Sequence, residues 1–235
     1  MRSFGAIAWL LLAALALVIP IRAESAEQQQ AQPPAAATAA PLYKPPLRGA
    51  PGGRVGGGTR GSEREVFVLS VLAPDHTGLT LNEQPSLYWF ISRSASSPVE
   101  LTVVDPRATQ PLLDMQVPPP VQAGVHRVRL ADHGVRLASG VAYRWYVAAV
   151  PDASRRSKDV LAGGAIERVE PPEGLQAKLA RAGKAELPSL YAEAGLWYDA
   201  VAAISELIEA APNDAALRKQ RAAMMTQVGL PEIGE

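Results

Sequence analysis

The side chains that could perform acid–base or metal chemistry in this sequence are few and scattered. The histidines are His76, His126 and His133, and no two of them have the spacing that places ligands on one face of a strand or helix. His76 and His133 each follow an aspartate in a turn-rich stretch, so a shared metal site requires their loops to meet at one end of the fold. The alternative is turn residues that hydrogen-bond to their own backbone. We expect no metal and no cofactor.

Covalent and hydrolytic chemistry are poorly supported. The chain has no cysteine, which excludes thiol nucleophiles, cysteine-based zinc sites and disulfides. It contains no Gly-x-Ser-x-Gly elbow, and its turn aspartates do not pair in any visible pattern. We therefore expect a protein that is not an enzyme, with a hydrolase as the least favoured alternative.

A glycine- and arginine-rich segment is a candidate for binding. Residues 48–61, RGAPGGRVGGGTRG, are half glycine, and Arg48, Arg54 and Arg60 recur every six residues. Its backbone amides could form an anion nest, but the segment has no lysine and leads into a predicted strand, unlike a phosphate loop. It is either an irregular lead-in to the fold or a contact to an anion or partner through its arginines.

A second basic stretch, RRSKD, begins with Arg155 and Arg156. It could be a solvated loop. Alternatively, one arginine pairs with Asp159 or another carboxylate and pins the loop, or the loop contacts an acidic partner.

Composition and the first residues favour export. Lysine plus arginine and aspartate plus glutamate each number 23, so nothing suggests nucleic acid or an acidic membrane surface. Residues 1–23 are typical of a signal peptide, with Arg2 before an apolar run; an uncleaved membrane anchor is the alternative. The lack of cysteine favours a bacterial periplasmic or extracellular protein. We expect a disordered Ala/Pro/Gln linker over 24–46 and a lead-in over 47–61.

The stretch 137–150, LASGVAYRWYVAAV, is the element that we expect to organise the fold. Tyr143 and Trp145 share one face of a strand, and Arg144 and Tyr146 take the other. Its Leu-x-x-Gly-x-x-Tyr start, with Gly140 in the turn, resembles the tyrosine corner of fibronectin III and immunoglobulin-like sandwiches, where the tyrosine hydroxyl bonds to backbone upstream.

Alternating patterns predict a mainly β fold over 62–172. We expect a seven-stranded antiparallel sandwich of the immunoglobulin/fibronectin III kind, with Trp89 in its core. In such a sandwich the strand of Trp89 would neighbour that of Tyr143, so Tyr88, Phe90 and Tyr146 would share an outward surface for a partner. The predicted strands are 65–72, 85–92, 99–104, 112–117, 126–130, 137–150 and 165–170.

The C-terminal part, 173–230, is predicted to be helical, with a tail over 231–235. Expected helices are 175–182, 187–194, 198–210 and 214–228, the last capped by Asn213. Tyr191, Gly195, Ala200 and Pro212 resemble one degenerate tetratricopeptide repeat. Since one repeat cannot bury its own apolar face, we expect it to dock on the Tyr88/Phe90/Tyr146 surface. The residues predicted to dock are Tyr191, Leu196, Trp197 and Ile204.

These motifs together resemble a bacterial family known as domain of unknown function 928 (DUF928). The matching elements are the Gly/Arg segment, PSLYWF at 85–90, YRWYVAAV followed by RRSKD, YAEAGLWYDA at 191–200 and VGL at 228–230. The resemblance implies an exported protein but no reaction or ligand. Some members carry cysteines that are absent here, so any bridge between them is dispensable.

Three functions remain open at this stage. The favoured one is an exported, non-enzymatic interaction or scaffold module of the bacterial envelope, whose partner is another envelope or secreted protein. A carbohydrate- or polymer-binding sandwich would instead show a row of exposed aromatic residues. A hydrolase would need a cleft with clustered carboxylates or histidines. The oligomeric state stays open.

Overall fold

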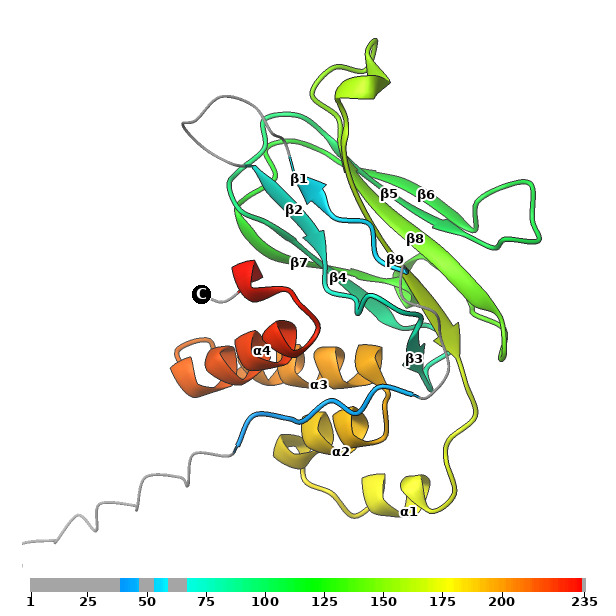
Figure 1. The fold of residues 1–235 in the computed structure, drawn as a ribbon, viewed down its shortest axis with the longest axis vertical. Helices are drawn as coiled ribbons and strands as arrows, with labels where there is room; N and C mark the ends of the chain where they lie inside the picture. Colours follow the sequence, from blue (N-terminus) through cyan, green and yellow to red (C-terminus); the bar gives the residue numbers. More distant parts are fainter. Residues whose placement is uncertain (1–38, 47–52, 59–66, 234–235) are drawn as a thin grey trace, which may run out of the picture. The chain divides into compact units, whose positions relative to one another are not determined.

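A computed structural model describes residues 39–46, 53–58 and 67–233 of the chain (Figure 1). The predicted signal peptide, most of the predicted linker, Arg48 and Arg60 lie outside these residues. Among the described helices, none has both the length and the apolar run that a membrane crossing requires.

The β-rich part consists of two sheets. The first has the order β1-β2-β4-β7 and is antiparallel throughout. The second has the order β3-β9-β8-β5-β6 and is antiparallel except where β3 pairs with β9. The strands are β1 Gly57–Gly58, β2 Val68–Val71, β3 Gly78–Thr80, β4 Ser86–Ile91, β5 Val99–Val104, β6 Leu113–Val117, β7 Gly124–Arg129, β8 Ala142–Ala149 and β9 Val160–Arg168. Each of the predicted strands overlaps one of these, and the short β1 and β3 are additional.

The predicted neighbours of the Trp89 strand are wrong. β4, which carries Trp89, pairs with β2 and β7, whereas β8, which carries Tyr143, pairs with β5 and β9 in the other sheet. Alternation in a sequence indicates which face of a strand is buried, but it does not specify which strands pair. Tyr88 and Phe90 therefore do not share a surface with Tyr146.

The core lies between the sheets and follows the predicted alternation. On β8 the side chains of Tyr143, Trp145 and Val147 are buried, while Arg144 is exposed. The Tyr143 hydroxyl accepts a hydrogen bond from the backbone N–H of Ala138 at 3.0 Å, five residues upstream. This bond is the one expected of a tyrosine corner and fixes the turn that leads into β8.

The C-terminal part is helical at the predicted places. Its α-helices are α1 Leu175–Leu179, α2 Leu187–Glu193, α3 Trp197–Ala210 and α4 Ala215–Gln227. Asp214, rather than the predicted Asn213, caps α4, because its carboxylate accepts from the N–H groups of Ala216 and Leu217. Gly195 and Gly229 follow helix ends with positive φ, as expected. Short 3₁₀ turns are η1 Leu130–His133, η2 Arg156–Lys158, η3 Lys184–Glu186 and η4 Pro231–Ile233.

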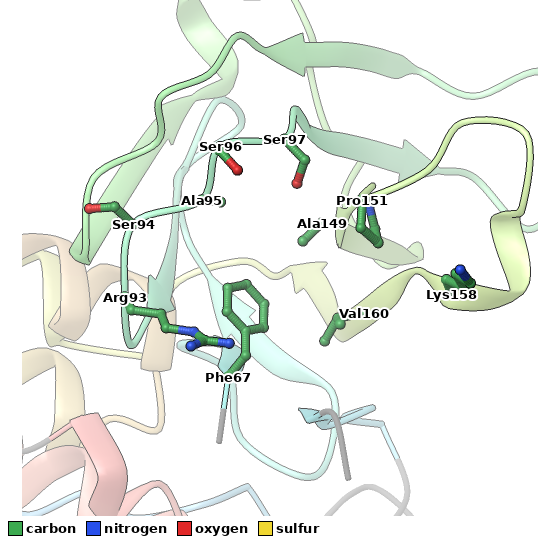
Figure 2. A pocket seen from close by; sticks show the side chains of 10 residues that line it. All are labelled: Phe67, Arg93, Ser94, Ala95, Ser96, Ser97, Ala149, Pro151, Lys158 and Val160. Atoms are coloured by element: carbon green, nitrogen blue, oxygen red, sulfur yellow. The ribbon is translucent and has the colours of Figure 1, made fainter. Parts of the chain in front are cut away.

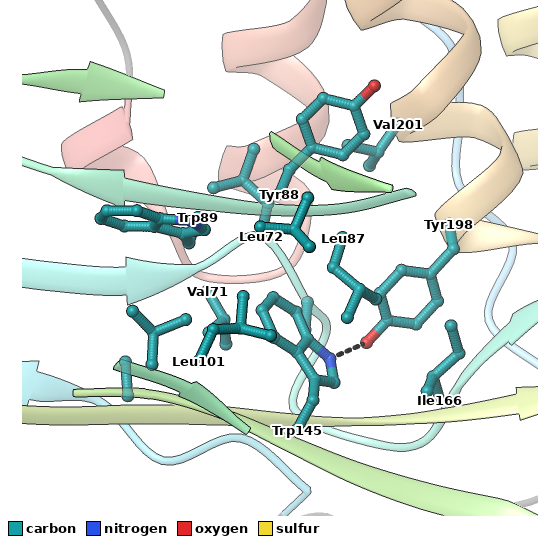
Figure 3. Close-up of a cluster of buried hydrophobic side chains, with 14 of the residues drawn as sticks. Val71, Leu72, Leu87, Tyr88, Trp89, Leu101, Trp145, Ile166, Tyr198 and Val201 are labelled. Carbon is teal, nitrogen blue, oxygen red and sulfur yellow. Dashed lines mark hydrogen bonds between the residues drawn. The ribbon is translucent and has the colours of Figure 1, made fainter. Parts of the chain in front are cut away.

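The apolar face of helix α3 packs against the core of the two sheets (Figure 3). Trp197 and Ile204 are fully buried, as the docking hypothesis requires, and Tyr88 is covered beneath α3. The Trp197 indole donates to the Leu72 carbonyl at 2.8 Å. Docking on Tyr146 does not occur, because that side chain belongs to the outer face of the other sheet.

Residues 39–46, which we call the strap, were predicted to belong to a disordered linker. This prediction is wrong, because the strap packs against the helical part. They run in extended form beside α2, α3 and α4 (the blue segment in Figure 1). Pro41 and Tyr43 are buried, whereas Leu42 is 60% exposed. The prediction followed from the Gln-, Ala- and Pro-rich composition of 24–46 as a whole, but one aromatic and one proline facing the helices are enough to anchor this part.

Candidate functional site

The histidines do not converge on a metal site. His126 donates from Nε2 to the Gln122 carbonyl at 2.7 Å and stacks on Trp89 with ring centroids 4.3 Å apart. His133 is exposed at the end of the turn η1. Within residues 39–46, 53–58 and 67–233, no cluster of three histidine or carboxylate side chains could hold a metal ion.

His76 lies in a hydrogen-bonded chain that sequence analysis missed. Its Nδ1 is 3.1 Å from the Asp75 carboxylate and its Nε2 is 2.9 Å from the Tyr43 hydroxyl. Burial, assisted by the charge of Asp75, raises the pKa of Tyr43 well above its usual range. The phenol therefore stays protonated, and its ring packs edge-on against Trp197. This chain holds Tyr43 in place and does not resemble an activated nucleophile.

Arg54 has a structural role in this same region. Its guanidinium donates to the carbonyls of Ala73, Val228 and Gly229 at 2.8–3.2 Å. Two of these carbonyls follow the end of α4, where a cation is favourable. Arg54 therefore joins the Gly/Arg segment to the helical part. These contacts give no support to the prediction that Arg54 binds an anion or a partner.

The basic loop after β8 is pinned by its own ion pairs. Arg155 pairs with Asp152 at 2.5 Å, and Arg156 pairs with both Glu100 at 2.5 Å and Asp159 at 2.7 Å. The hydrogen bonds from Arg156 lower the pKa of Glu100. The prediction that an arginine pairs with Asp159 and fixes the loop is confirmed.

The aromatic residues predicted to meet a partner are differently placed. Tyr88 is 3% exposed and burial raises its pKa, so it is not accessible to a partner. Phe90 is partly buried against the core. Tyr146 lies over Gly163 and lines a hollow of about 280 Å³ on the outer face of the second sheet.

The residues predicted to be structural are at the centre of the fold. Trp89 and Trp145 are essentially fully buried, and Gly140 has a φ of 72° in the turn before β8. The Trp145 indole donates to the hydroxyl of Tyr198 at 2.9 Å, and that hydroxyl donates to the Ala165 carbonyl at 3.0 Å. Tyr198 comes from α3, so this pair couples the helical part to the sandwich (Figure 3).

A candidate site is a cavity between the sheets, at the opposite end of β2 and β9 from the helices (Figure 2). Its volume is about 360 Å³. Three segments form it: the start of β2, the connection from β4 to β5, and the connection from β8 to β9. The lining residues are Phe67, Arg93, Ser94, Ala95, Ser96, Ser97, Ala149, Pro151, Lys158 and Val160.

The first wall of this cavity is held by backbone pairing. Ala95 exchanges two hydrogen bonds with Val121, at 2.8 and 3.0 Å, and the Ser94 hydroxyl accepts from the Ala123 N–H at 3.2 Å. Figure 2 shows the hydroxyls of Ser96 and Ser97 directed toward the space above the Phe67 ring. A short serine-rich turn thus presents hydroxyls from a fixed backbone.

The cations of the cavity come from both sides. The Arg93 guanidinium lies 5.6 Å from the centroid of the Phe67 ring, a cation–π geometry. Lys158 belongs to the pinned basic loop, is exposed, and its ammonium has no ion-pair partner among the described residues. No carboxylate is among the described lining residues. The cavity therefore combines the ammonium of Lys158, hydroxyl groups and an apolar floor, which suits an acidic group attached to an apolar body.

Sequence analysis did not select this cavity. Its signals in the sequence are the Ser-Ala-Ser-Ser run at 94–97 and the lysine of RRSKD, and both are typical of ordinary turns and loops. The two runs are more than 50 residues apart, and only the pairing of the strands brings them together.

Comparison with known proteins identifies a family but no function. The family model described as Domain of Unknown Function (DUF928) matches residues 55–235, in agreement with the resemblance carried by the motifs. None of the curated proteins matches the chain.

Proposed function

The chain belongs to the DUF928 family, and from that premise we propose that it is an exported, non-enzymatic protein-interaction module of the bacterial envelope. The observation that carries the proposal is the cavity at the open end of the sandwich, which offers Lys158 and serine hydroxyls and no carboxylate among its described lining residues. We expect the partner to be an envelope or secreted protein that inserts an acidic side chain or a carboxyl terminus there.

Two features support binding over catalysis. The Tyr43–His76–Asp75 chain runs from an exposed carboxylate to a buried phenol packed against Trp197, with no activated nucleophile. The cavity offers cations and hydroxyls but no paired base among its described residues. Export is supported by the signal-like residues 1–23.

The architecture supports an immunoglobulin-like ancestry for the scaffold. Taking β8 as the tyrosine-corner strand F, the pairing order β9-β8-β5-β6 corresponds to G-F-C-C′, and β2-β4-β7 corresponds to A-B-E. Trp89 then lies on strand B rather than on the strand C position assumed from sequence. The helices α2 and α3 correspond to one degenerate tetratricopeptide repeat that leans on this sandwich.

The test is affinity capture from the native envelope fraction with the full chain. We expect one or a few proteins to co-purify with the wild-type chain and with Lys184→Glu, an exposed substitution outside the cavity. Lys158→Glu reverses a cavity charge and should lose them. Equal capture by Lys158→Glu and wild type would contradict this role of the cavity.

A polymer-binding sandwich is the second candidate, favoured by one observation. Tyr146 lines the hollow on the outer sheet face together with Thr102, Leu161 and the Glu100–Arg156 pair, a combination able to stack on and hydrogen-bond a sugar ring. Because Tyr88 is buried, the informative variant is Tyr146→Ala. Binding to insoluble polysaccharide that this variant abolishes would favour the second candidate.

A further inference from the structure

The strap is held by contacts that recognise an extended peptide. The Lys44 N–H donates to the Ala192 carbonyl of α2 at 3.0 Å. The Gln227 side chain of α4 contacts the strap twice: its oxygen accepts from the Tyr43 N–H and its nitrogen donates to the Pro41 carbonyl, both at 2.9 Å. Main-chain hydrogen bonds of this kind bind a backbone irrespective of most side chains.

Specificity comes from alternate side chains. Pro41 and Tyr43 are buried, whereas Leu42 and Lys44 face away. The Tyr43 ring packs against Trp197 with centroids 4.8 Å apart, and its hydroxyl bonds to His76. We call the residues that receive the strap the strap site: His76, Ala192, Gly195, Trp197 and Gln227.

Gly195 shows how closely the strap approaches the helices. It has a φ of 77°, and a Cβ added there would lie 2.9 Å from the Lys44 carbonyl oxygen. A side chain at this position would push the strap away. The glycine at the end of α2 therefore has two uses, as a left-handed helix terminator and as the point of close contact.

The strap and its site fall on opposite sides of the family boundary. The DUF928 match begins at residue 55, after the strap, while every residue of the strap site lies within it. The acceptor residues therefore lie within the matched region, and the strap lies before it.

From this arrangement we infer that the strap site is a docking site for an extended segment of the pattern Pro-x-Tyr-x-Pro carried by a partner, and that the chain's own strap blocks it in cis. The inference deepens the proposed function and rests on it, since it names a second contact of the interaction module. The seated strap defines the chemistry of the occupant: a buried tyrosine, a proline two residues before it, and a free backbone N–H on the tyrosine and on the residue after it.

The strap competes with a free peptide at a high effective concentration, on the order of millimolar for a short tether. Weakening the strap should therefore strengthen apparent peptide binding. Tyr43→Ala removes the ring contact with Trp197 and the bond to His76, so it should favour the open site. Leu42→Ala changes an exposed side chain of the same segment and serves as the matched control.

The experiment measures fluorescence anisotropy of a labelled peptide with the sequence of residues 39–46, titrated with full-length chains. We expect Tyr43→Ala to bind the peptide at least about tenfold more tightly than the wild-type chain, and Leu42→Ala to behave like wild type. A peptide with alanine in place of the tyrosine should not bind. A folded Tyr43→Ala chain that binds neither peptide up to about 1 mM would overturn the inference.

A second measurement decides the question if Tyr43→Ala does not fold. Excess unlabelled peptide should accelerate hydrogen exchange of the Tyr43 and Lys44 amides in the wild-type chain, and unchanged exchange would overturn the inference. A concentration-dependent dimer with exchanged straps would assign the site to a second copy and overturn the partner assignment. Lys158→Glu changes the cavity and not the strap site, so this variant should retain peptide binding. Failure of the cavity proposal can therefore be distinguished from failure of the strap-site inference.

Discussion

Removal of one buried hydroxyl should measure how strongly the helical part and the sandwich are coupled. Tyr198→Phe keeps the ring, which is 2% exposed, and deletes only the oxygen between the Trp145 indole N–H and the Ala165 carbonyl. The side chain of Trp145 is fully buried, so water cannot replace the lost partner. The variant therefore leaves one buried donor and one buried acceptor unpaired.

The expected cost follows from those two groups. An unsatisfied buried donor or acceptor costs about 1–3 kcal/mol, so losing the partner of two such groups should lower the free energy of unfolding by about 2–6 kcal/mol. For a chain of this size, each kcal/mol lowers Tm by about 2–4 °C. Removal of a single oxygen atom should thus lower Tm by about 4–24 °C.

Urea and thermal unfolding followed by circular dichroism test this estimate. Tyr191→Phe on α2 is the matched control, because that side chain is partly buried and its hydroxyl has no hydrogen-bond partner among the described residues. We expect the control to change stability by less than about 0.5 kcal/mol. A Tyr198→Phe chain as stable as the control would refute the view that the hydroxyl couples the two parts.

Three further predictions concern stability and titration. Burial raises the pKa of Asp199 from 3.8 to about 6, although the hydrogen bonds from Leu81 and Thr80 oppose this shift. The protonated side chain therefore stabilises the folded state fully below pH 3.8, and this stabilisation is lost as pH rises through about 6. Since the side chain keeps some solvent contact, the free energy of unfolding of the wild-type chain should fall by only about 1–2 kcal/mol over this pH window. Asp199→Asn should not show this pH-dependent fall. Gly163→Ala places a Cβ 2.5 Å from the Tyr146 ring, so it should cost about 1–3 kcal/mol and shift the NMR signals of that ring; an unchanged Tm would argue against the close contact. Arg156→Ala should raise the pKa of Glu100 toward its ordinary value in a carboxyl NMR titration, and an unmoved titration would mean that the pair does not persist in solution.

The local elements were predictable because their signals are local. Alternation over 137–150 placed Tyr143 and Trp145 inward, and the Leu-x-x-Gly-x-x-Tyr spacing anticipated the hydroxyl bond to Ala138. Glycines and a run of helix formers placed α2, α3 and α4 within a few residues. These features depend on the rise of the strand and the turn of the helix, which the sequence carries directly.

Pairing and placement were not predictable in the same way. The separation of Tyr88 from Tyr146 depends on which strands pair, and each strand's alternation is compatible with several neighbours. The strap was mistaken for linker because the whole stretch 24–46 is rich in Gln, Ala and Pro, although Pro41 and Tyr43 are buried and backbone bonds to Ala192 and Gln227 hold it. The cavity lined by Ser97 and Lys158 exists only after distant loops meet at one end of the sandwich.

Site-specific photocrosslinking in native cells tests the central claim most directly. A photoreactive residue at Ser97 would lie inside the cavity, and one at Lys184 would lie on an unrelated exposed turn. We predict a discrete protein adduct from position 97 that disappears when Lys158 is changed to glutamate, and none from position 184. Absence of any protein adduct at 97, or an adduct that Lys158→Glu leaves unchanged, would contradict the account.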